Sequence, residues 1–324
     1  MARKIRRDLS LTNCWLYSIS SKPDLARRLS TDKYPVTVDQ LERLASDEGH
    51  FKEFPKTNRK GKVRQVQEPI RELQRIHERV HKLLSRIEVP SYLHSAVRGK
   101  SYLTNADAHS LTAPTVKIDI QSFFKSVPRS AVKAFFRDSL QCREDVCGLM
   151  ADLLTFNGHL PTGSCSSPII SYYAFKAMFD EIHTLALENG LMMSCYVDDM
   201  TFSGDNATKS FLYKVHGLIA SHGLKSHKMK IFAENEPRVV TGVCLTPDGR
   251  RVPNQLHLDI KVGFDALVAG QGDLKKIKAT LLGQLEAARQ IEPKFGMRAR
   301  TLRHSAIVAG AQDTTPQKTV AFKK

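Results

Sequence analysis

The chain has 324 residues, enough to bury a large core in one long domain or a few closely packed subdomains. Its 49 Lys and Arg residues outnumber 33 acidic residues, a net charge of +16 that favours a polyphosphate-binding protein, with simple solubility as the alternative. The six cysteines form no CxxC pair and no apolar run reaches membrane length, which argues against a disulfide framework, a zinc knuckle and a membrane span. We therefore expect a cytoplasmic protein with no membrane partner.

Residues 1–50 are predicted to form an N-terminal helical extension, with a capping box at Thr37 and Gln40. The segments FKEFPK and KVRQVQ then flank the turn-like TNRKG, which predicts a hairpin. Two cations of this hairpin, Lys62 and Arg64, would project from the same face of a strand. An amphipathic helix is expected after Pro69, with its arginines largely off the apolar face.

The segment TVKIDIQSFF, residues 115–124, alternates like a strand with one buried face. Helices are expected at about 129–140, 144–156 and 168–190. The segments LMMSCYV and MTFSG then read as two strands whose connection carries Asp198 and Asp199.

Helical patterns continue from about 207 to Gly223, over 258–291 and over 297–310. The segment RVVTGVCL, residues 238–245, is predicted to be one strand. Residues 313–324 resemble a frayed, flexible tail. Because helices accumulate between the strands of one antiparallel sheet, the fold class is predicted to be α+β.

Two adjacent aspartates on a hairpin and a third, Asp119, at the end of a separate strand offer hard oxygen ligands for Mg²⁺. A pair of such ions about 3.5–4 Å apart would stabilise the attacking and leaving oxygens of a phosphoryl displacement. Without cations the three carboxylates would repel one another. The alternative is that Asp198 and Asp199 only form a polar turn, because a YxDD string alone is not specific.

Several motifs in one order make a more specific pattern. They are KVRQVQEPIRELQ (62–74), DIQSFF (119–124), LPTGSCSSP (160–168), YVDD (196–199) and GLKSHKMK (223–230). Together they resemble the reverse transcriptases, over about residues 50–310. NADAH (105–109) and VTG (240–242) resemble elements of the bacterial retron reverse transcriptases in particular.

The resemblance implies that Asp119, Asp198 and Asp199 are catalytic and, with the backbone carbonyl of Ile120, hold two Mg²⁺ ions. It implies nucleotide binding by Lys62, Arg64, Phe124, Gly163 and Lys230. The aromatic ring of Phe124 would be a steric gate against a 2′-hydroxyl. Each has a plainer alternative, because Phe124 could be a core residue, the hairpin cations a solvated face and Gly163 an ordinary turn glycine.

The two retron-type elements supply candidates for RNA recognition, namely Asn105, His109, Val240, Thr241 and Gly242. For His109 a structural role is an equal alternative, and no catalytic step is assigned to it. The resemblance further implies a right-hand architecture with an antiparallel palm sheet and a helical thumb. Its expected parts are the extension at 1–50, fingers at 51–118, palm at 119–250 with fingers elements interleaved around 128–165, and thumb at 251–312.

The implied activity is RNA-directed DNA synthesis from deoxynucleoside triphosphates. The template would be the chain's own structured noncoding RNA of the msr–msd type, priming would use a 2′-hydroxyl, and the product would be branched multicopy single-stranded DNA. A host ribonuclease H would remove the template, and an effector protein would act with the enzyme in antiphage defence. Alternatives are a group II intron-like or diversity-generating reverse transcriptase and a noncatalytic RNA-binding scaffold.

Three residues depart from the usual pattern of the family. Thr162 stands where Gln is usual, His227 where Asn is usual, and Val197 where many retron enzymes have Ala. The first two would affect the positioning of template or nucleotide. None of the three replaces a carboxylate.

Overall fold

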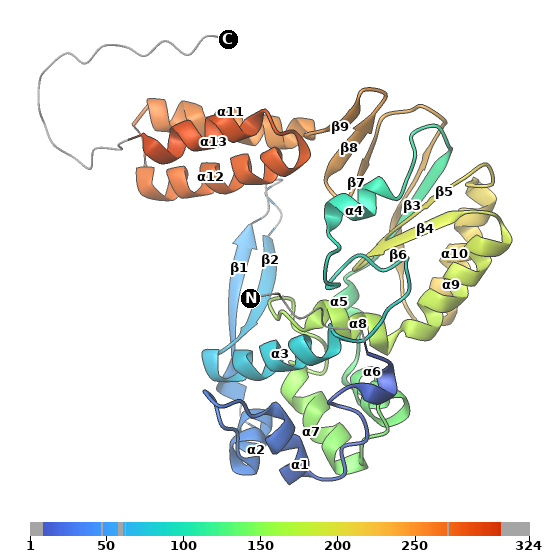
Figure 1. Ribbon diagram of the computed structural model, residues 1–324, viewed down its shortest axis with the longest axis vertical. Coiled ribbons are helices and arrows are strands. Elements are labelled where there is room, and N and C mark those ends of the chain that lie inside the picture. The colour runs from blue at the N-terminus through green and yellow to red at the C-terminus, as the bar shows by residue number, and fades with distance from the viewer. Residues whose placement is uncertain (1–8, 47, 58–60, 62, 271, 306–324) are drawn as a thin grey trace, which may run out of the picture. The chain divides into compact units, whose positions relative to one another are not determined.

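The computed structural model describes residues 9–46, 48–57, 61, 63–270 and 272–305 (Figure 1). The chain divides into two compact units, one made of residues 1–241 with 245–247 and the other of residues 242–244 with 248–324. Helices and antiparallel strands alternate along the chain, so the predicted α+β class is confirmed. No helix in the described ranges is long and apolar enough to span a bilayer.

Unit 1 opens with short helices, a hairpin and a longer helix. These elements are η1 (Leu11–Asn13), α1 (Lys22–Leu29), α2 (Val38–Ser46), η2 (Glu48–His50), β1 (Phe51–Thr57), β2 (Val63–Pro69), α3 (Arg71–Leu84) and α4 (Tyr102–Asp107). The hairpin is antiparallel, with Phe51 opposite Pro69. The apolar positions of α3, such as Leu73, Ile76 and Val80, are buried as their helical spacing predicts.

A four-stranded antiparallel sheet forms the centre of unit 1. Its strands are β3 (Thr115–Ile120), β4 (Met192–Tyr196), β5 (Asp199–Ser203) and β6 (Ser226–Phe232), in the order β4-β5-β3-β6. Helix α10 (Lys209–Ser221) packs against β3 and β6, and α9 (Lys176–Glu188) packs against β4 and α10 (Figure 1). These helices cover one face of the sheet and leave the ends of its strands to carry polar side chains.

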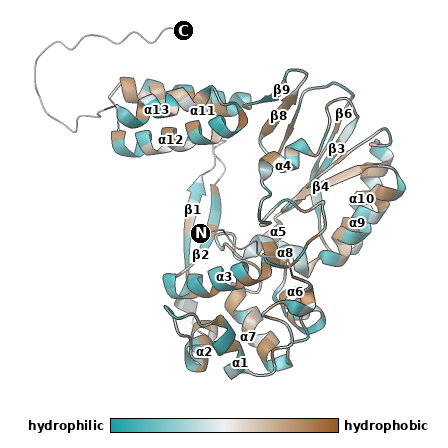
Figure 2. Cartoon of the chain, viewed as in Figure 1, coloured by the Kyte–Doolittle hydropathy of each residue, from teal (hydrophilic) through white to brown (hydrophobic). Residues whose placement is uncertain are grey.

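The remaining helices of unit 1 form a largely apolar layer. They are α5 (Phe123–Ser126), α6 (Arg129–Ala134), the π-helical turn η3 (Phe135–Ser139), α7 (Glu144–Leu154) and α8 (Ser167–Ala174). Most residues of α7 are buried, and much of this helix is brown in Figure 2. Burial of apolar surface on this scale is the main force that holds these helices to one another and to the neighbouring α2 and α9.

Unit 2 is mainly a helical hairpin with a third helix. Helix α12 (Leu274–Ile291) packs against both α11 (Asn254–Val268) and α13 (Phe295–His304), and its buried side chains include Leu281 and Leu285. The strands β7 (Arg238–Val240), β8 (Val243–Thr246) and β9 (Gly249–Arg251) form a small sheet in that order, and the boundary between the units falls along this stretch.

Three predicted elements are interrupted in the structure. The helix expected at 168–190 breaks at Phe175, where the backbone leaves helical geometry with φ −120° and ψ 23°. The helix expected at 258–291 ends at Val268, and Gly270 beyond it has a φ of +64°. The strand expected at 238–245 turns back at Thr241 and Gly242, which both have positive φ.

A candidate active site on the central sheet

The register of the central sheet brings the three predicted aspartates together. Asp119 on β3 is the direct partner of Asp199 on β5. Asp198 lies in the two-residue connection between β4 and β5, and its carbonyl accepts a hydrogen bond of 2.9 Å from the backbone N–H of Ile120. Residues about 80 positions apart in the sequence therefore meet because two antiparallel strands align them.

The pair of neighbouring aspartates sits in different electrostatic surroundings. Burial, and secondarily the charge of Asp119, raises the pKa of Asp198 to about 6. No side chain in the described part of the chain hydrogen-bonds the Asp198 carboxylate. Burial also raises the pKa of Asp199, but Lys117 opposes this rise. Asp198 is thus the carboxylate whose ionised form a bound cation would stabilise most.

Protein cations already approach the other two carboxylates. The Lys117 Nζ atom lies 3.0 Å from Asp199 Oδ2 and donates a second bond of 3.1 Å to the Val239 carbonyl. At the other carboxylate, Lys228 Nζ lies 2.7 Å from Asp119 Oδ2, and His227 Nε2 lies 3.1 Å from the same oxygen. Lys117 is nearly buried, whereas the Lys228 side chain is 55% exposed and is free to move away.

A β-bulge explains why β6 presents Lys228 to the site. Between the pairs Lys117 with Lys230 and Asp119 with His227, β6 has one more residue than β3. Lys228 lies in this irregular stretch and has a φ of +55°. Bulges re-aim side chains next to functional sites. The charged neighbour of Asp119 is therefore Lys228, whereas Lys230, a predicted nucleotide-binding residue, is exposed on the same strand.

The donor set fits a divalent cation in its chemistry. Asp119 and Asp198 supply hard carboxylate oxygens, and the ammonium group of Lys228 lies where a cation would be attracted. Within the described ranges, no group of three or more His, Cys, Asp or Glu side chains is positioned to hold a metal. Lys117 pairs with Asp199, so Asp119 and Asp198 are the two carboxylates best placed to meet a metal.

The turn that carries Asp198 is strained and held from outside. Val197 has a φ of +62°, a left-handed conformation that is costly for a β-branched residue. Its backbone N–H donates a 3.0 Å hydrogen bond to the Ser95 hydroxyl. Residues 92–94, which precede Ser95, run beside β4. There the Cys195 N–H donates to the Tyr92 carbonyl at 2.7 Å, and the His94 N–H donates to the Cys195 carbonyl at 2.9 Å. Residues 92–95 therefore act as a brace for the turn.

The loop around Gly163 packs on the β1–β2 hairpin. Gly163 N–H donates to the Gln67 carbonyl at 2.8 Å, and a Cβ atom added at this glycine would lie 2.6 Å from that oxygen. The Thr162 hydroxyl contacts Gln65 and Gln67. Gly163 thus lies close to strand β2, and its role in nucleotide binding stays a prediction.

We expect Gly163→Ala to lower the free energy of unfolding by about 1–3 kcal/mol, because the new methyl group must displace backbone. Gly217→Ala is a matched control, since its added Cβ meets nothing within 4 Å on α10 and a helical alanine is favoured. Urea unfolding followed by circular dichroism measures both variants. Equal stability of the Gly163 variant and the parent would contradict the prediction.

The other predicted nucleotide-binding residues are placed separately. Lys62 lies outside the described residues, so its expected pairing with Arg64 on one face is not observed. Arg64 is exposed on β2. Phe124 is half-buried on α5, next to the fully buried Phe123, with ring centroids 6.3 Å apart. The partly open position of Phe124 is compatible with a contact to substrate, which stays a prediction.

The two retron-type elements meet in the structure. The Thr241 hydroxyl donates to the Tyr102 carbonyl at 2.9 Å and accepts a 3.4 Å hydrogen bond from the Asn105 amide. These bonds support the positive φ of Thr241, +45°, and Gly242 follows with +84°. Asn105 and Val240 are fully buried. These residues join α4 to the turn, and a role of the two elements in RNA recognition stays a prediction.

His109 is also a structural residue. It is 4% exposed, and its two ring nitrogens lie 2.7 Å from the hydroxyls of Ser194 and Ser203 on the neighbouring strands β4 and β5. Burial, and then nearby cations, lowers the pKa of His109 to about 3. Of the alternatives raised by the sequence, the structure favours the satisfied buried imidazole over an RNA contact.

Because His109 is neutral when folded, protons favour the unfolded chain. The contribution of His109 to the free energy of unfolding is present above pH 6.5 and is lost as the pH falls from 6.5 toward 3. At pH 5 this histidine should cost about 2 kcal/mol of unfolding free energy relative to pH 7. In urea titrations at both pH values, His109→Gln should remove that part of the pH dependence and His304→Gln, at an exposed position, should not. Identical pH dependence in parent and His109→Gln would refute the assignment.

Sequence reasoning missed three residues that organise the site, namely Lys117, Lys228 and Ser95. A signal existed for Lys117, because strand alternation places it on the same face as Asp119. No comparable signal marks Lys228, since the bulge changes the register, or Ser95, which lies about 100 positions from the turn that it braces.

Known proteins show the same sequence pattern. The family described as reverse transcriptase (RNA-dependent DNA polymerase) matches residues 54–245, more than half of the chain and all three aspartates. The chain therefore belongs to the reverse transcriptase family. Among its curated relatives is the retron Se72 reverse transcriptase of Salmonella heidelberg (strain 579083-10), which is 29% identical over 192 residues, 57% of this chain and 51% of that one.

Another relative, the retron Ec48 reverse transcriptase of Escherichia coli, is 26% identical over 260 residues, 74% of this chain and 63% of that one. The chain thus spans about half to two thirds of the length of these two relatives, and the predicted resemblance to retron reverse transcriptases is confirmed. Among solved structures, a foamy viral protease-reverse transcriptase in complex with double-stranded DNA aligns with 93% of this chain and 45% of that chain, at 17% identity and a TM-score of 0.46.

Proposed function

We propose that this chain is an RNA-directed DNA polymerase whose active site is formed by Asp119, Asp198 and Asp199. The observation that carries the proposal is the pairing of Asp119 with Asp199 across β3 and β5, with Asp198 in the adjoining turn. A noncatalytic scaffold has no use for a half-buried, unpaired carboxylate such as Asp198 in a chain of charge +16. Membership of the reverse transcriptase family supports the same reaction.

Asp119 and Asp198 would hold two Mg²⁺ ions with help from the Ile120 carbonyl. Bound there, the ions would supply charge stabilisation for the attacking sugar hydroxyl and the leaving pyrophosphate. Lys117 holds Asp199 in place through its ion pair. Lys228 releases Asp119 when the site is loaded, which its exposed side chain permits.

Other residues would bind the incoming deoxynucleoside triphosphate. Arg64, exposed on β2, offers a bidentate contact to phosphate. Phe124 would lie under the sugar and exclude a 2′-hydroxyl. We retain roles for Lys62, Gly163 and Lys230 in the same function, with Gly163 acting through its contact to β2.

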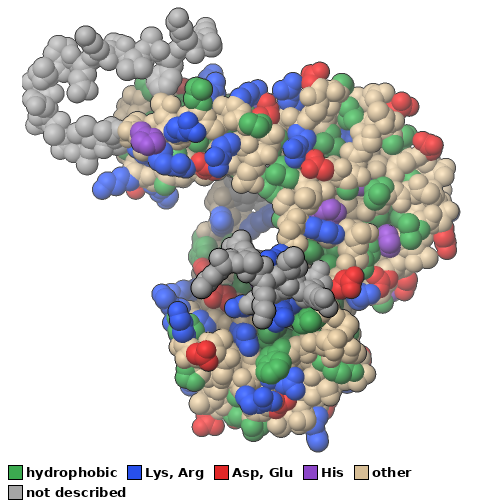
Figure 3. Space-filling model, in the orientation of Figure 1, with side chains coloured by type: hydrophobic (Ala, Val, Ile, Leu, Met, Phe, Trp, Pro, Cys, Tyr) green, Lys and Arg blue, Asp and Glu red, His purple; other side chains and the backbone are tan. Residues whose placement is uncertain are grey.

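We assign residues 51–118 to fingers, 119–250 to palm and 251–312 to thumb. The helices of unit 2 carry exposed cations suited to the backbone of an RNA–DNA hybrid, namely Lys275, Lys276, Arg298 and Arg300. Figure 3 shows Lys and Arg side chains spread over the visible face and not confined to one point. Such a distribution favours contacts along an extended strand.

The retron relatives favour a narrower function. The template would be a cognate structured noncoding RNA, priming would start from a 2′-hydroxyl, and the product would be branched multicopy single-stranded DNA. The cellular setting would be the bacterial cytoplasm, where a ribonuclease H removes template and an effector protein couples the complex to antiphage defence.

Primer extension tests the polymerase assignment directly. The purified chain is supplied with an RNA template, an annealed DNA primer, Mg²⁺ and deoxynucleoside triphosphates. We expect template-dependent DNA, and a chain that binds RNA without extending the primer would instead be a scaffold. Detection of a branched RNA–DNA species in cells tests the retron assignment separately.

A further inference from the structure

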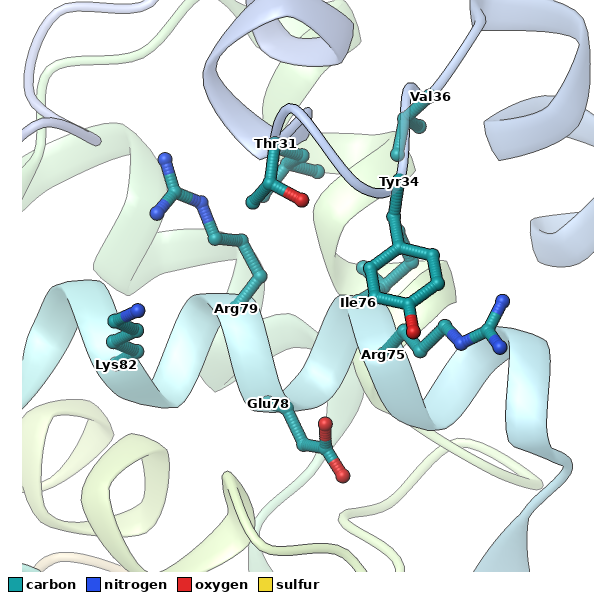
Figure 4. Close-up of a pocket in the computed structure, with 9 residues that line it drawn as sticks. Thr31, Tyr34, Val36, Arg75, Ile76, Glu78, Arg79 and Lys82 are labelled. Carbon is teal, nitrogen blue, oxygen red and sulfur yellow. The ribbon is translucent and has the colours of Figure 1, made fainter.

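A second basic site lies among the N-terminal helices of unit 1. A cavity of about 170 Å³ opens between α3 and the loop that follows α1 (Figure 4). Its lining combines an apolar base, an aromatic ring and several charged groups. The lining residues are Leu29, Thr31, Tyr34, Val36, Arg75, Ile76, Glu78, Arg79 and Lys82.

Helical spacing places the three cations along one stripe of α3. Arg75, Arg79 and Lys82 are separated by four and three residues, which aligns their side chains. In Figure 4 they lie on the side of α3 that faces the loop, while the carboxylate of Glu78 points away from it. The cavity therefore presents positive charge, although Glu78 belongs to its lining.

The three cations of this stripe differ in their contacts with the protein. The Arg79 guanidinium donates two hydrogen bonds, of 3.0 and 3.3 Å, to the Arg28 carbonyl and so fastens the end of α1 to α3. Within the described ranges, the side chains of Arg75 and Lys82 make no hydrogen bond or ion pair with protein. Two cationic groups at the cavity are consequently available to an anion.

Tyr34 adds an aromatic surface to the charge. The turn at Thr31–Tyr34 is closed by two backbone hydrogen bonds of 3.0 Å between these residues, which fix the backbone that carries the ring. The Tyr34 ring is 47% exposed, and the Arg75 guanidinium lies 4.2 Å from its centroid. Asp32 and Lys33 on the same turn carry opposite charges. An ordered aromatic ring beside unpaired cations is the arrangement on which single-stranded nucleic acids stack.

We propose that this cavity binds one phosphate and sugar of a single-stranded nucleic acid, with the adjoining base stacked on Tyr34. The volume is too small for an ordinary ligand pocket of about 300 Å³ or more, but it suits one backbone unit of a strand that continues over the surface. The site is separate from the three aspartates. This second site goes beyond the proposed function. It rests on that function only because a polymerase of this kind handles single strands.

The test measures binding without catalysis. A labelled oligouridylate is titrated by fluorescence anisotropy in EDTA, without nucleotides, at several salt concentrations. Arg75→Ala with Lys82→Ala should reduce the slope of log Kd against log salt by about 0.7, because the two cations together neutralise one phosphate of the single strand. Tyr34→Ala should weaken binding about tenfold and leave the slope unchanged, and Tyr34→Phe should bind like the parent.

Helix α10 offers a matched control outside this cavity. Lys209 Nζ lies 5.8 Å from the ring of Tyr213, which is 52% exposed, so Lys209→Ala with Tyr213→Ala removes similar groups elsewhere. This double variant should leave affinity and slope unchanged. Thermal melts identify any variant that fails to fold, and a strand carrying 5-iodouridine should crosslink to Tyr34.

Three results would overturn the proposal, namely unchanged binding in all cavity variants, crosslinks confined to other segments, or displacement of the strand by polyglutamate at equal charge. Titration with the matching DNA strand distinguishes an RNA template from a DNA product. Primer extension by Tyr34→Ala on a short annealed duplex should equal the parent. Loss of strand binding at Tyr34 in a chain that extends no primer would support the cavity and refute only the polymerase assignment.

Discussion

Asp198→Asn should lower the rate of primer extension on the order of a thousandfold or more, while the affinity for RNA stays within about twofold of the parent. The change preserves the shape of the side chain but removes the carboxylate that the β4-β5 turn places near Asp119. RNA binding rests on the basic surface, which is untouched. Primer extension and filter binding measure the two effects on one protein preparation.

Asp205→Asn is the matched control for this experiment. Asp205 follows β5 closely in sequence but is exposed and outside the cluster, so its loss should leave primer extension unchanged. The Asp198 variant should also be no less stable than the parent, because no side chain of the described residues bonds that carboxylate and its burial beside Asp119 is unfavourable. Full activity in Asp198→Asn would remove the polymerase assignment.

Lys117→Met should lower the free energy of unfolding by about 3–5 kcal/mol and also reduce primer extension. The substitution leaves Asp199 charged, mostly buried and without its ion pair, and it deprives the Val239 carbonyl of a donor. Urea unfolding measures the stability change. The expected loss is large because the partner that remains is a carboxylate removed from water.

The control for this prediction lies on the neighbouring strand. Lys230 pairs with Lys117 across β3 and β6 but is exposed, so Lys230→Met should change stability by less than about 0.5 kcal/mol. The double variant Lys117→Met with Asp199→Asn should recover much of the lost stability, since no uncompensated charge remains. Similar losses for the two single lysine variants would show that the buried ion pair is not what stabilises this sheet.

Local patterns were sufficient for most elements because each element buries a repeating apolar face. The alternation of Val116, Ile118 and Ile120 predicted β3, and all three are fully buried. Breaks within long patterns were missed, as at Phe175 and Gly270, because helical spacing continues across a short interruption. One of the two hydrogen bonds of the predicted capping box forms, because the Gln40 N–H donates to the Thr37 hydroxyl at 3.2 Å. The Gln40 side chain does not return to the backbone of Thr37 and instead donates to Glu72.

The acidic residues, their neighbouring strands and the resemblance to reverse transcriptases were predictable from the amino-acid sequence, because motif order and strand periodicity are local properties of the chain. Which cation accompanies which carboxylate depends instead on the folded arrangement of the strands. Lys117 and Lys228 reach Asp199 and Asp119 through strand pairing and a bulge. The folded arrangement also decided that Asn105 and His109 are buried, since burial and register depend on segments far apart in the sequence.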